Sequence, residues 1–194
     1  KKEGMAIYLL FLQHIIYSLK PGGKAAVVVP TGFITAQSGI DKKIREKLVS
    51  KKMLAGVVSM PSNIFATTGT NVSILFIDGQ NKEGVVLIDA SNLGAKVKDG
   101  KNKKTLLSEV EEDKIIAAFN SKQIIDGFST VVSYDQIESK NCSLSAGQYF
   151  DVKVEYSDIT PEQFLNKMQG FTDELDRLFK ESHRLEKDVF KKLS

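Results

Sequence analysis

The chain has 194 residues, of which 42% are hydrophobic and 26% charged, and its formal net charge is +3. This composition is typical of an ordinary globular protein and excludes a disordered or fibrous chain. This mildly basic net charge is compatible with a nucleic-acid partner but does not indicate one. The single cysteine, Cys142, excludes an internal disulfide framework and a multi-cysteine metal site, and it favours a cytoplasmic location.

Residues 5–19 are apolar nearly all round, and we expect them to form a helix that is covered on more than one side. The run is too short and too interrupted by polar residues to span a membrane. A turn at Pro21-Gly22-Gly23 ends it. Residues 25–29 then read as a strand buried on both faces of a parallel sheet. A hydrophobic first helix with no strand before it favours a segment of a longer polypeptide.

Ser38 followed by Asp41 is typical of a helix start with a capping box, and apolar residues at every fourth position continue the helix to about Ser50. Residues 54–59 form the next expected strand. Strand, helix and strand with short connections predict a right-handed βαβ unit.

Residues 57–78 contain two apolar strands on either side of a polar, Gly-containing loop. Phe65 lies in this loop, and Thr70 and Asn71 close it. An aromatic ring beside hydrogen-bonding groups could stack on a nucleobase, whereas a ring at a loop edge can equally well fill the core. The sequence alone leaves these two alternatives for Phe65 open.

Beyond residue 84 the pattern is a strand at 85–88, a lysine-rich segment at 96–104, a helix from 106 to 119 capped by Ser108 and Glu111, and a short strand at 129–133. We expect the lysine-rich segment to be a solvated loop. Its lysines could contact phosphate, although solubility is the simpler explanation of a charge run.

Thr160, Pro161 and Gln163 predict the start of a long helix, because Thr caps, Pro fits the first turn and Gln completes the box. A heptad pattern of apolar residues follows, interrupted once by Ser182, and so narrow a stripe needs a partner. The partner is either the chain's own domain or the helices of another subunit. The residues of this stripe, called the heptad stripe, are Phe164, Met168, Phe171, Leu175, Leu178, Leu185 and Val189.

Catalytic and metal-binding sets are missing from the sequence. His14 lies on an apolar helix and is read as a packed core residue, while His183 lies on the charged tail helix. Neither has an acid or cysteine partner at the spacing of a triad or a metal site. We therefore expect no metal, no catalytic residue within this chain, and chemistry only with residues from elsewhere.

The order of the segments resembles the C-terminal part of the modification (methyltransferase) subunit of type I restriction-modification systems, an adenine-specific (N6) DNA methyltransferase family. Pro-Gly-Gly before a strand is a weak signal by itself, and the ordered series is a strong one. The segments that carry the resemblance are 19–30, 44–48, 57–65 with Met60-Pro61-Ser62-Asn63-Ile64-Phe65, 71–76, 88–91 and 145–151 with Tyr149-Phe150-Asp151.

The resemblance implies methyl transfer from S-adenosylmethionine to adenine N6 in DNA, with the base flipped out of the duplex. Phe65 matches the aromatic that stacks on the flipped base, and Thr70 and Asn71 would line the same pocket. The family's Asn-Pro-Pro-aromatic tetrapeptide and its Gly-rich cofactor loop do not occur in this sequence. Both would lie upstream of Lys1, so we expect the isolated chain to be inactive.

The resemblance also implies a specificity subunit, whose long helices would receive the heptad stripe, and a restriction subunit of the same complex. We expect an α/β fold, the C-terminal half of a Rossmann-like class I methyltransferase sheet, followed by a small mixed region and a long helix. The expected divisions are 1–92 for the catalytic half, 93–157 for a peripheral mixed region and 158–194 for the docking helix. The alternative is a non-catalytic interaction module that uses the tail helix.

Overall fold

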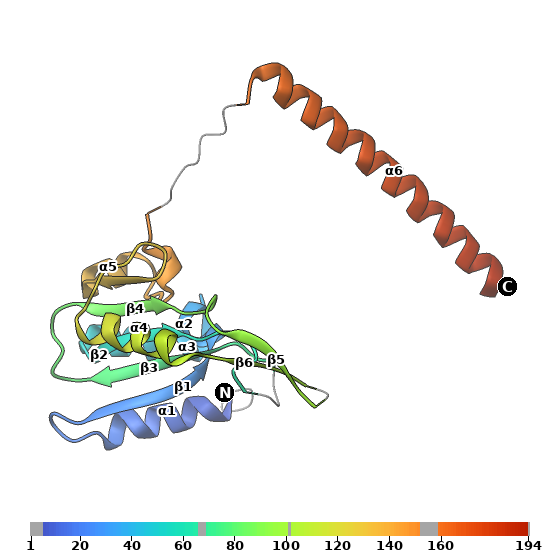
Figure 1. The fold of residues 1–194 in the computed structure, drawn as a ribbon. Helices are drawn as coiled ribbons and strands as arrows, with labels where there is room; N and C mark the ends of the chain where they lie inside the picture. Colours follow the sequence, from blue (N-terminus) through green and yellow to red (C-terminus); the bar gives the residue numbers. More distant parts are fainter. Residues whose placement is uncertain (1–5, 66–68, 101, 152–158, 194) are drawn as a thin grey trace. The chain divides into compact units, whose positions relative to one another are not determined.

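The computed structural model of the protein describes residues 6–65, 69–100, 102–151 and 159–193. The chain divides into two compact units, Lys1–Asp151 and Val152–Ser194 (Figure 1). Within the described ranges, no helix combines the length and the apolar character that crossing a membrane requires.

The first unit is built on a five-stranded mixed sheet. Strand β3 pairs antiparallel with both β1 and β2, β2 runs parallel to β4, and β7 pairs antiparallel with β4. The two strands of the expected βαβ unit, β1 and β2, therefore run in the same direction but are separated by β3. In spatial order the strands are β1 (Lys24–Pro30), β3 (Val72–Asp78), β2 (Leu54–Ser59), β4 (Val85–Asp89) and β7 (Ser129–Val132).

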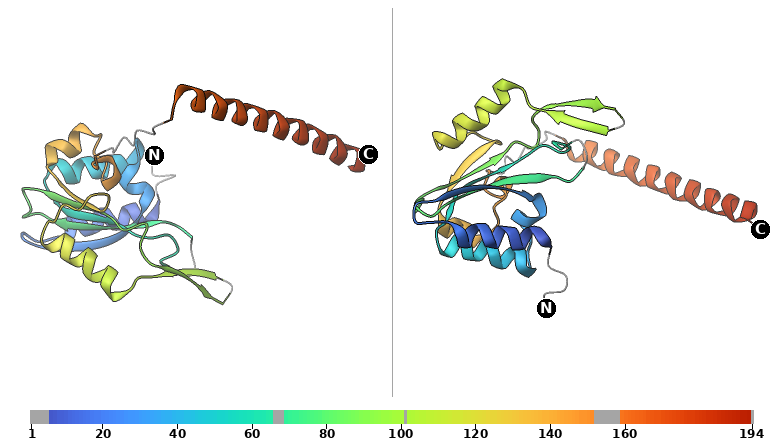
Figure 2. Two further views of the ribbon diagram at one scale, coloured as in Figure 1. Left: turned by 45° about the horizontal axis from the view of Figure 1, so that its top comes forward. Right: turned by 90° about the horizontal axis from the view of Figure 1, so that it is seen from below.

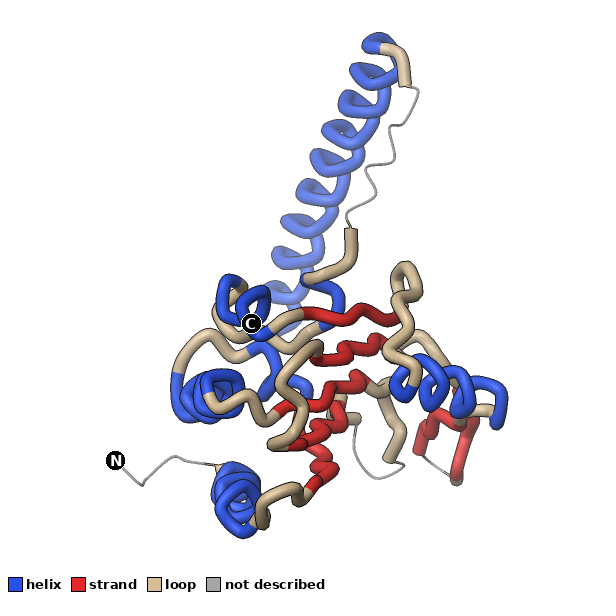
Figure 3. The backbone as a smooth tube through the Cα atoms, turned by 90° about the vertical axis from the view of Figure 1, so that its left-hand side faces the viewer, coloured by secondary structure: helices blue, strands red, loops and turns tan. Residues whose placement is uncertain are grey.

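Helices cover both faces of this sheet, as Figure 3 shows. One face packs against α1 (Ile7–Ser18), α2 (Thr31–Thr35), α3 (Gly39–Ser50) and α5 (Tyr134–Ser139), followed by a 3-10 turn at Ala146–Gln148. The other face packs against α4 (Glu109–Asn120). This arrangement confirms the expected α/β class. A separate two-stranded hairpin, β5 (Ala95–Asp99) with β6 (Asn102–Leu106), projects beyond the sheet beside α4 (Figure 2).

Two helix starts illustrate how local sequence becomes structure. Ser108 and Glu111 form the expected capping box of α4, with the Ser108 side chain accepting from the Glu111 amide and the Glu111 carboxylate accepting from the Ser108 amide. Ser38 occupies the expected N-cap position of α3 but makes no side-chain cap bond. Asp41 accepts a hydrogen bond from the Tyr8 hydroxyl instead, so the box predicted there is wrong.

The N-terminal edge of the unit is more exposed than the sequence predicts. Helix α1 buries Leu9 and Leu12 but leaves Phe11 exposed, and His14 is exposed as well. The expectations that this helix is covered on several sides and that His14 is a core residue are therefore wrong for this structure. Strand β1 was expected to be buried on both faces, yet Val29 is its only buried residue, because β1 lies at the edge of the described sheet.

The lysine-rich segment is also different from the prediction, because it forms the β5–β6 hairpin rather than a loop. Gly100 lies at the turn with a φ of +60°, a conformation that glycine adopts without steric cost. Asp-Gly between alternating strand residues is a strong hairpin signal. The strong local charge obscured this signal in the sequence.

Three polar groups organise the interior of the first unit. The Arg45 guanidinium is fully buried and donates to the backbone carbonyls of Cys142, Phe33 and Ala36, and burial lowers its pKa. These bonds join α3 to the segment after β1 and to the loop after α5. No carboxylate among the described residues pairs with this guanidinium, so the three carbonyls are its compensation.

The Tyr134 hydroxyl is the second interior group. It accepts a hydrogen bond from the Leu54 amide at 3.0 Å and lies 2.9 Å from each of the carbonyl oxygens of Leu54 and Asn81, to which it donates. Burial raises the pKa of this hydroxyl, which keeps it protonated and able to donate. The tyrosine therefore ties α5 to the start of β2.

Asp78, at the end of β3, is the third group. Its carboxylate accepts the Gln80 amide at 2.9 Å and forms an ion pair with Lys24 at 3.1 Å. The hydrogen bond from the Gln80 amide, and then the contact with Lys24, hold the pKa of this carboxyl below its usual range. Close packing matters nearby, because a Cβ at Gly56 would lie 2.4 Å from the Val86 carbonyl oxygen and 2.6 Å from the Phe119 ring.

The second unit contains α6 (Pro161–Leu193). Its start is as predicted: the Thr160 amide donates to Gln163, and the Gln163 amide donates to the Thr160 hydroxyl. All seven residues of the heptad stripe, called the α6 stripe from here on, are exposed, each by 46% to 64%. Within the described residues of this unit there is no second helix against which the stripe could pack.

Candidate functional site

The candidate site lies where β1, β2 and β4 end. These three strands run in the same direction, so their carboxyl ends meet at one edge of the sheet. In open α/β sheets this edge is where ligands bind. The segments that leave it are α2 after β1, residues 60–71 after β2 and residues 90–94 after β4.

Both ends of the 60–71 loop are fixed by backbone hydrogen bonds. The Met60 amide donates to the Val72 carbonyl at 3.0 Å, and the Thr31 amide donates to the Asn71 carbonyl at 2.9 Å. The hydroxyls of Thr31 and Ser73 lie 3.2 Å apart and are hydrogen bonded. The loop is therefore anchored at its base to β3 and to the segment that follows β1.

The first half of the loop is also held by the hairpin. Thr105 of β6 donates its hydroxyl to the Ser62 carbonyl at 2.6 Å and its amide to the Asn63 carbonyl at 2.9 Å. Asn63 has a φ of +57°, the left-handed conformation that asparagine tolerates better than most residues. The chain thus turns sharply just before Phe65.

The structure places Phe65 at the end of this turn with 46% of its surface exposed. Thr70 and Asn71 are exposed on the returning side of the same loop. Residues 66–68, which include two of the loop's hydroxyl groups, lie outside the described ranges. An open ring is available for stacking, but its role remains a prediction.

The described part of this edge offers groups that are suited to binding a ligand. It offers one aromatic ring, hydroxyls and amides, and its carboxylate, Asp89, accepts the Ser91 amide at 3.0 Å. No group of three histidines, cysteines or carboxylates that could hold a metal occurs in the described part of the chain. The sequence also has no Gly-rich loop of the kind that receives S-adenosylmethionine.

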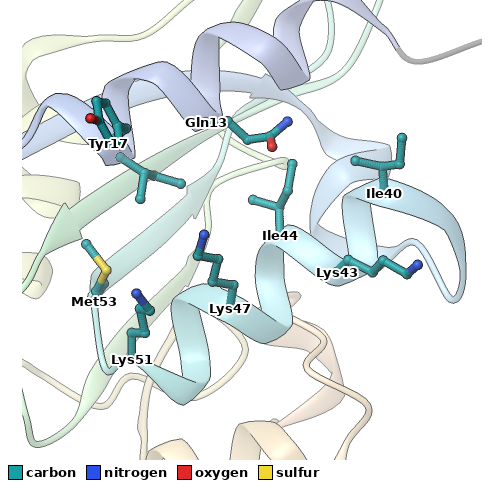
Figure 4. A pocket seen from close by; sticks show the side chains of 9 residues that line it. Gln13, Tyr17, Ile40, Lys43, Ile44, Lys47, Lys51 and Met53 are labelled. Atoms are coloured by element: carbon teal, nitrogen blue, oxygen red, sulfur yellow. The ribbon is translucent and has the colours of Figure 1, made fainter. Parts of the chain in front are cut away.

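A groove of about 670 Å³ lies elsewhere, between α1 and α3 (Figure 4). Its lining includes Ile16 and Ile44, two lysines of α3 and Lys51, which directly follows α3. The groove lies on the face of the sheet that packs against α1, α2, α3 and α5, and its lining includes no residue of the 60–71 loop. We therefore do not regard it as part of the candidate site.

Sequence reasoning found Phe65, Thr70 and Asn71 but missed the residues that position them. Thr31 and Thr105 are distant in sequence from the loop and belong to no motif, and nothing in the sequence pairs Ser73 with Thr31. The hairpin could have been found from its Asp-Gly turn. Its attachment to Ser62 depends on tertiary structure and left no local signal.

Comparison with known proteins identifies the family. The family model described as N-6 DNA Methylase matches residues 2–158. The type I restriction enzyme MpnII methylase subunit of Mycoplasma pneumoniae is 33% identical over 153 residues, covering 78% of this chain and 27% of that protein. The HindI methylase subunit of Haemophilus influenzae is 28% identical over 193 residues, covering 94% of this chain and 42% of that protein.

A solved structure agrees with this assignment. The methyltransferase subunit of the type I restriction-modification system of Streptococcus thermophilus superposes with a TM-score of 0.68 at 26% identity, covering 77% of this chain and 31% of that chain. The expected Rossmann-like class I methyltransferase fold is thereby confirmed. The chain spans less than half of the length of each of these relatives. The match over residues 2–158 shows that the chain belongs to the N-6 DNA methylase family.

Proposed function

We propose that this chain is part of the modification subunit of a type I restriction-modification system, which methylates adenine N6 in DNA with S-adenosylmethionine. The observation that supports this proposal most directly is the position of Phe65. Its ring is half exposed at the carboxyl edge of the sheet, on a loop whose two ends are hydrogen bonded to the strands. The chain would supply one wall of the pocket for the target base.

The proposed role of Phe65 is to stack on an adenine that has left the duplex. A base can be modified only after it has left the stack, and unstacking it costs free energy. Stacking the extruded base on an aromatic ring offsets part of that free energy. Stacking one base on an aromatic side chain contributes about 1–3 kcal/mol. Thr70 and Asn71, exposed on the same loop, would offer hydrogen-bonding groups to the edge of the base.

Methyl transfer itself would need residues that this chain does not contain. S-adenosylmethionine supplies the methyl group, and the family's Asn-Pro-Pro-aromatic tetrapeptide holds the adenine amine, yet neither that tetrapeptide nor a Gly-rich loop occurs here. We expect the 194-residue chain to transfer no methyl group from labelled cofactor to DNA. Robust transfer by the isolated chain would contradict this division of labour.

The proposed role of α6 is to dock the subunit. A continuous exposed apolar stripe on a 33-residue helix is suited to packing against other helices. The helices proposed to receive it belong to the specificity subunit, which joins the modification and restriction subunits in a cytoplasmic complex. In this proposal residues 1–92 form the catalytic half, 93–157 a peripheral region and 158–194 the docking helix.

The test of the base pocket uses the complete modification subunit assembled with its specificity subunit. Phe65→Ala should weaken binding of an extruded base by about 5- to 150-fold, which corresponds to the loss of 1–3 kcal/mol. 2-Aminopurine at the target position reports extrusion by its fluorescence. The matched variants are Phe65→Tyr, which keeps the ring and should bind normally, and Phe65→Leu, which keeps the apolar bulk and should not.

The opposite pattern would identify Phe65 as a core residue. In that case Phe65→Ala would lower the free energy of unfolding, Phe65→Leu would largely restore it, and base binding by the folded fraction would be unchanged. Circular dichroism in urea, recorded on the same preparations, separates the two patterns.

A further inference from the structure

We propose that one face of the β5–β6 hairpin binds the phosphates of the DNA strand beside the extruded adenine. DNA as the partner rests on the proposed function. The position and chemistry of the surface come from the hairpin itself. Five lysines and one aspartate lie between residues 96 and 104.

The hairpin is attached directly to the loop that carries Phe65. Thr105 makes two hydrogen bonds to Ser62 and Asn63, as described above. At the base of β5, the Gly94 amide donates to the Glu111 carboxylate at 2.8 Å, which fixes the hairpin to the start of α4. A Cβ at Gly94 would lie 2.6 Å from the Thr105 side chain, so the two strands are closely packed there.

The lysines are not distributed evenly over the two faces. Residues directly opposite each other on antiparallel strands share a face, and Thr105 is opposite Lys96 while Lys103 is opposite Lys98. Residues alternate along each strand, so Lys96, Lys98, Lys103 and Thr105 lie on one face. Thr105 turns this face toward the Phe65 loop, whereas the other face carries Lys104 with Val97 and Leu106.

The charges on this face are exposed and uncompensated among the described side chains. Lys96, Lys98 and Lys103 are exposed and form no ion pair with any side chain that the structure describes. Like charges directly opposite each other destabilise a strand pair, and Lys98 and Lys103 are such a pair. An anion bound between them removes that repulsion.

Solubility alone would not require this arrangement. On α3, by comparison, Lys42 is balanced by Glu46 one turn away at 3.7 Å. Phosphodiester groups are the anions that would be adjacent to a flipped base, because the backbone on either side of it must pass close to the aromatic ring. The hairpin would therefore position the strand, and the loop would receive the base.

The experiment measures binding of a fluorescein-labelled duplex as a function of salt, with the complete subunit assembled with its specificity subunit and, in parallel, with the 194-residue chain. The test variant is K96Q/K98Q/K103Q. The matched control is K43Q/K47Q/K51Q on and directly after α3, called the α3 control below, which changes the net charge equally in the groove between α1 and α3. Lys104→Gln tests the opposite face of the same hairpin. Circular dichroism verifies that each variant is folded.

We expect the hairpin variant to lose about 2–3 units of the slope of log K against log salt, because each phosphate contact contributes about 0.9. Raising the salt from 50 to 200 mM should therefore weaken DNA binding by the hairpin variant about 40-fold less than it weakens DNA binding by the unmodified protein. The α3 control and Lys104→Gln should keep the full slope. An unchanged slope in the hairpin variant, or an equal loss in the α3 control, overturns the hairpin proposal.

The two proposals fail in different ways. If the assembled protein methylates DNA while the hairpin variant keeps the full slope, only the hairpin inference is wrong. If the unmodified proteins bind DNA through the hairpin but the assembled protein transfers no methyl group to adenine, the proposed function is wrong and the phosphate surface stands. If neither protein binds DNA, both are wrong.

Discussion

Replacing Tyr134 by Phe removes one buried oxygen and no carbon, so its effect can be worked out from the hydrogen bonds of that oxygen. The Leu54 amide donates to it at 3.0 Å, and Leu54 is fully buried, so the amide would lose its partner in a place that water does not reach. The Leu54 carbonyl would keep its bond from the Asn81 side chain at 2.7 Å, and the Asn81 carbonyl, which also loses the hydroxyl, belongs to a partly exposed residue that water can reach. The free energy of unfolding should therefore fall by the penalty for one buried donor without a hydrogen-bond partner, about 1–3 kcal/mol.

The assay is cooperative unfolding in urea and on heating, followed by circular dichroism. The midpoint temperature should fall by about 2–4 °C for each kcal/mol lost in a unit of this size. Tyr17→Phe is the control, because the Tyr17 side chain is 89% exposed and its hydroxyl is solvated. If Tyr134→Phe unfolded at the same urea concentration as the unmodified chain, the tie between α5 and β2 would be energetically irrelevant and the reasoning refuted.

Three further predictions concern other parts of the chain. Gly56→Ala should destabilise the first unit by about 1–3 kcal/mol through overpacking, measured by urea unfolding, whereas Gly79→Ala, with open space around its Cβ, should not. Leu175→Asp with Leu178→Asp should abolish assembly with the specificity subunit in size-exclusion chromatography and leave the unfolding of the first unit unchanged; assembly that survived would mean that the α6 stripe is not the docking surface. The hydrogen bond from the Gln80 amide, and then the contact with Lys24, depress the pKa of Asp78, so its contribution to stability is full above the unfolded pKa of about 4 and is lost as the pH falls through the folded pKa. Asp78→Asn should flatten this acid-side loss in pH-dependent unfolding, and an unchanged profile would exclude the Asp78 carboxylate as its cause.

The sequence was most informative where one segment determines its own structure. The capping boxes at Ser108 and Thr160 need only residues three positions apart, and both are formed. The strands that flank Phe65 were also predictable, because they are rich in β-branched residues, which favour buried strands. The same local reasoning failed at Ser38, where Asp41 binds the distant Tyr8 instead.

The candidate site shows the same limit. Phe65 could be singled out because it is an aromatic residue in a polar loop. The exposure of its ring depends on the tertiary structure and could not be predicted from the sequence. The neighbours that hold the loop, Thr31, Ser73 and Thr105, are brought together by strand order and hairpin placement. Strand order is a global property of the sheet, and no local pattern encodes it.

The position of β3 between β1 and β2 has a consequence for how this unit folds. Lys24 pairs with Asp78 and Pro30 with Val72, so β1 finds its only strand partner in the described sheet late in the chain. A nascent polypeptide that ends before Val72 would hold two apolar strands in the same direction with no backbone partner between them. Closing so long a loop is entropically slow, and exposed strand edges invite aggregation in the meantime. During synthesis, therefore, β1 should lack its β3 partner and be prone to aggregation until β3 has emerged from the ribosome.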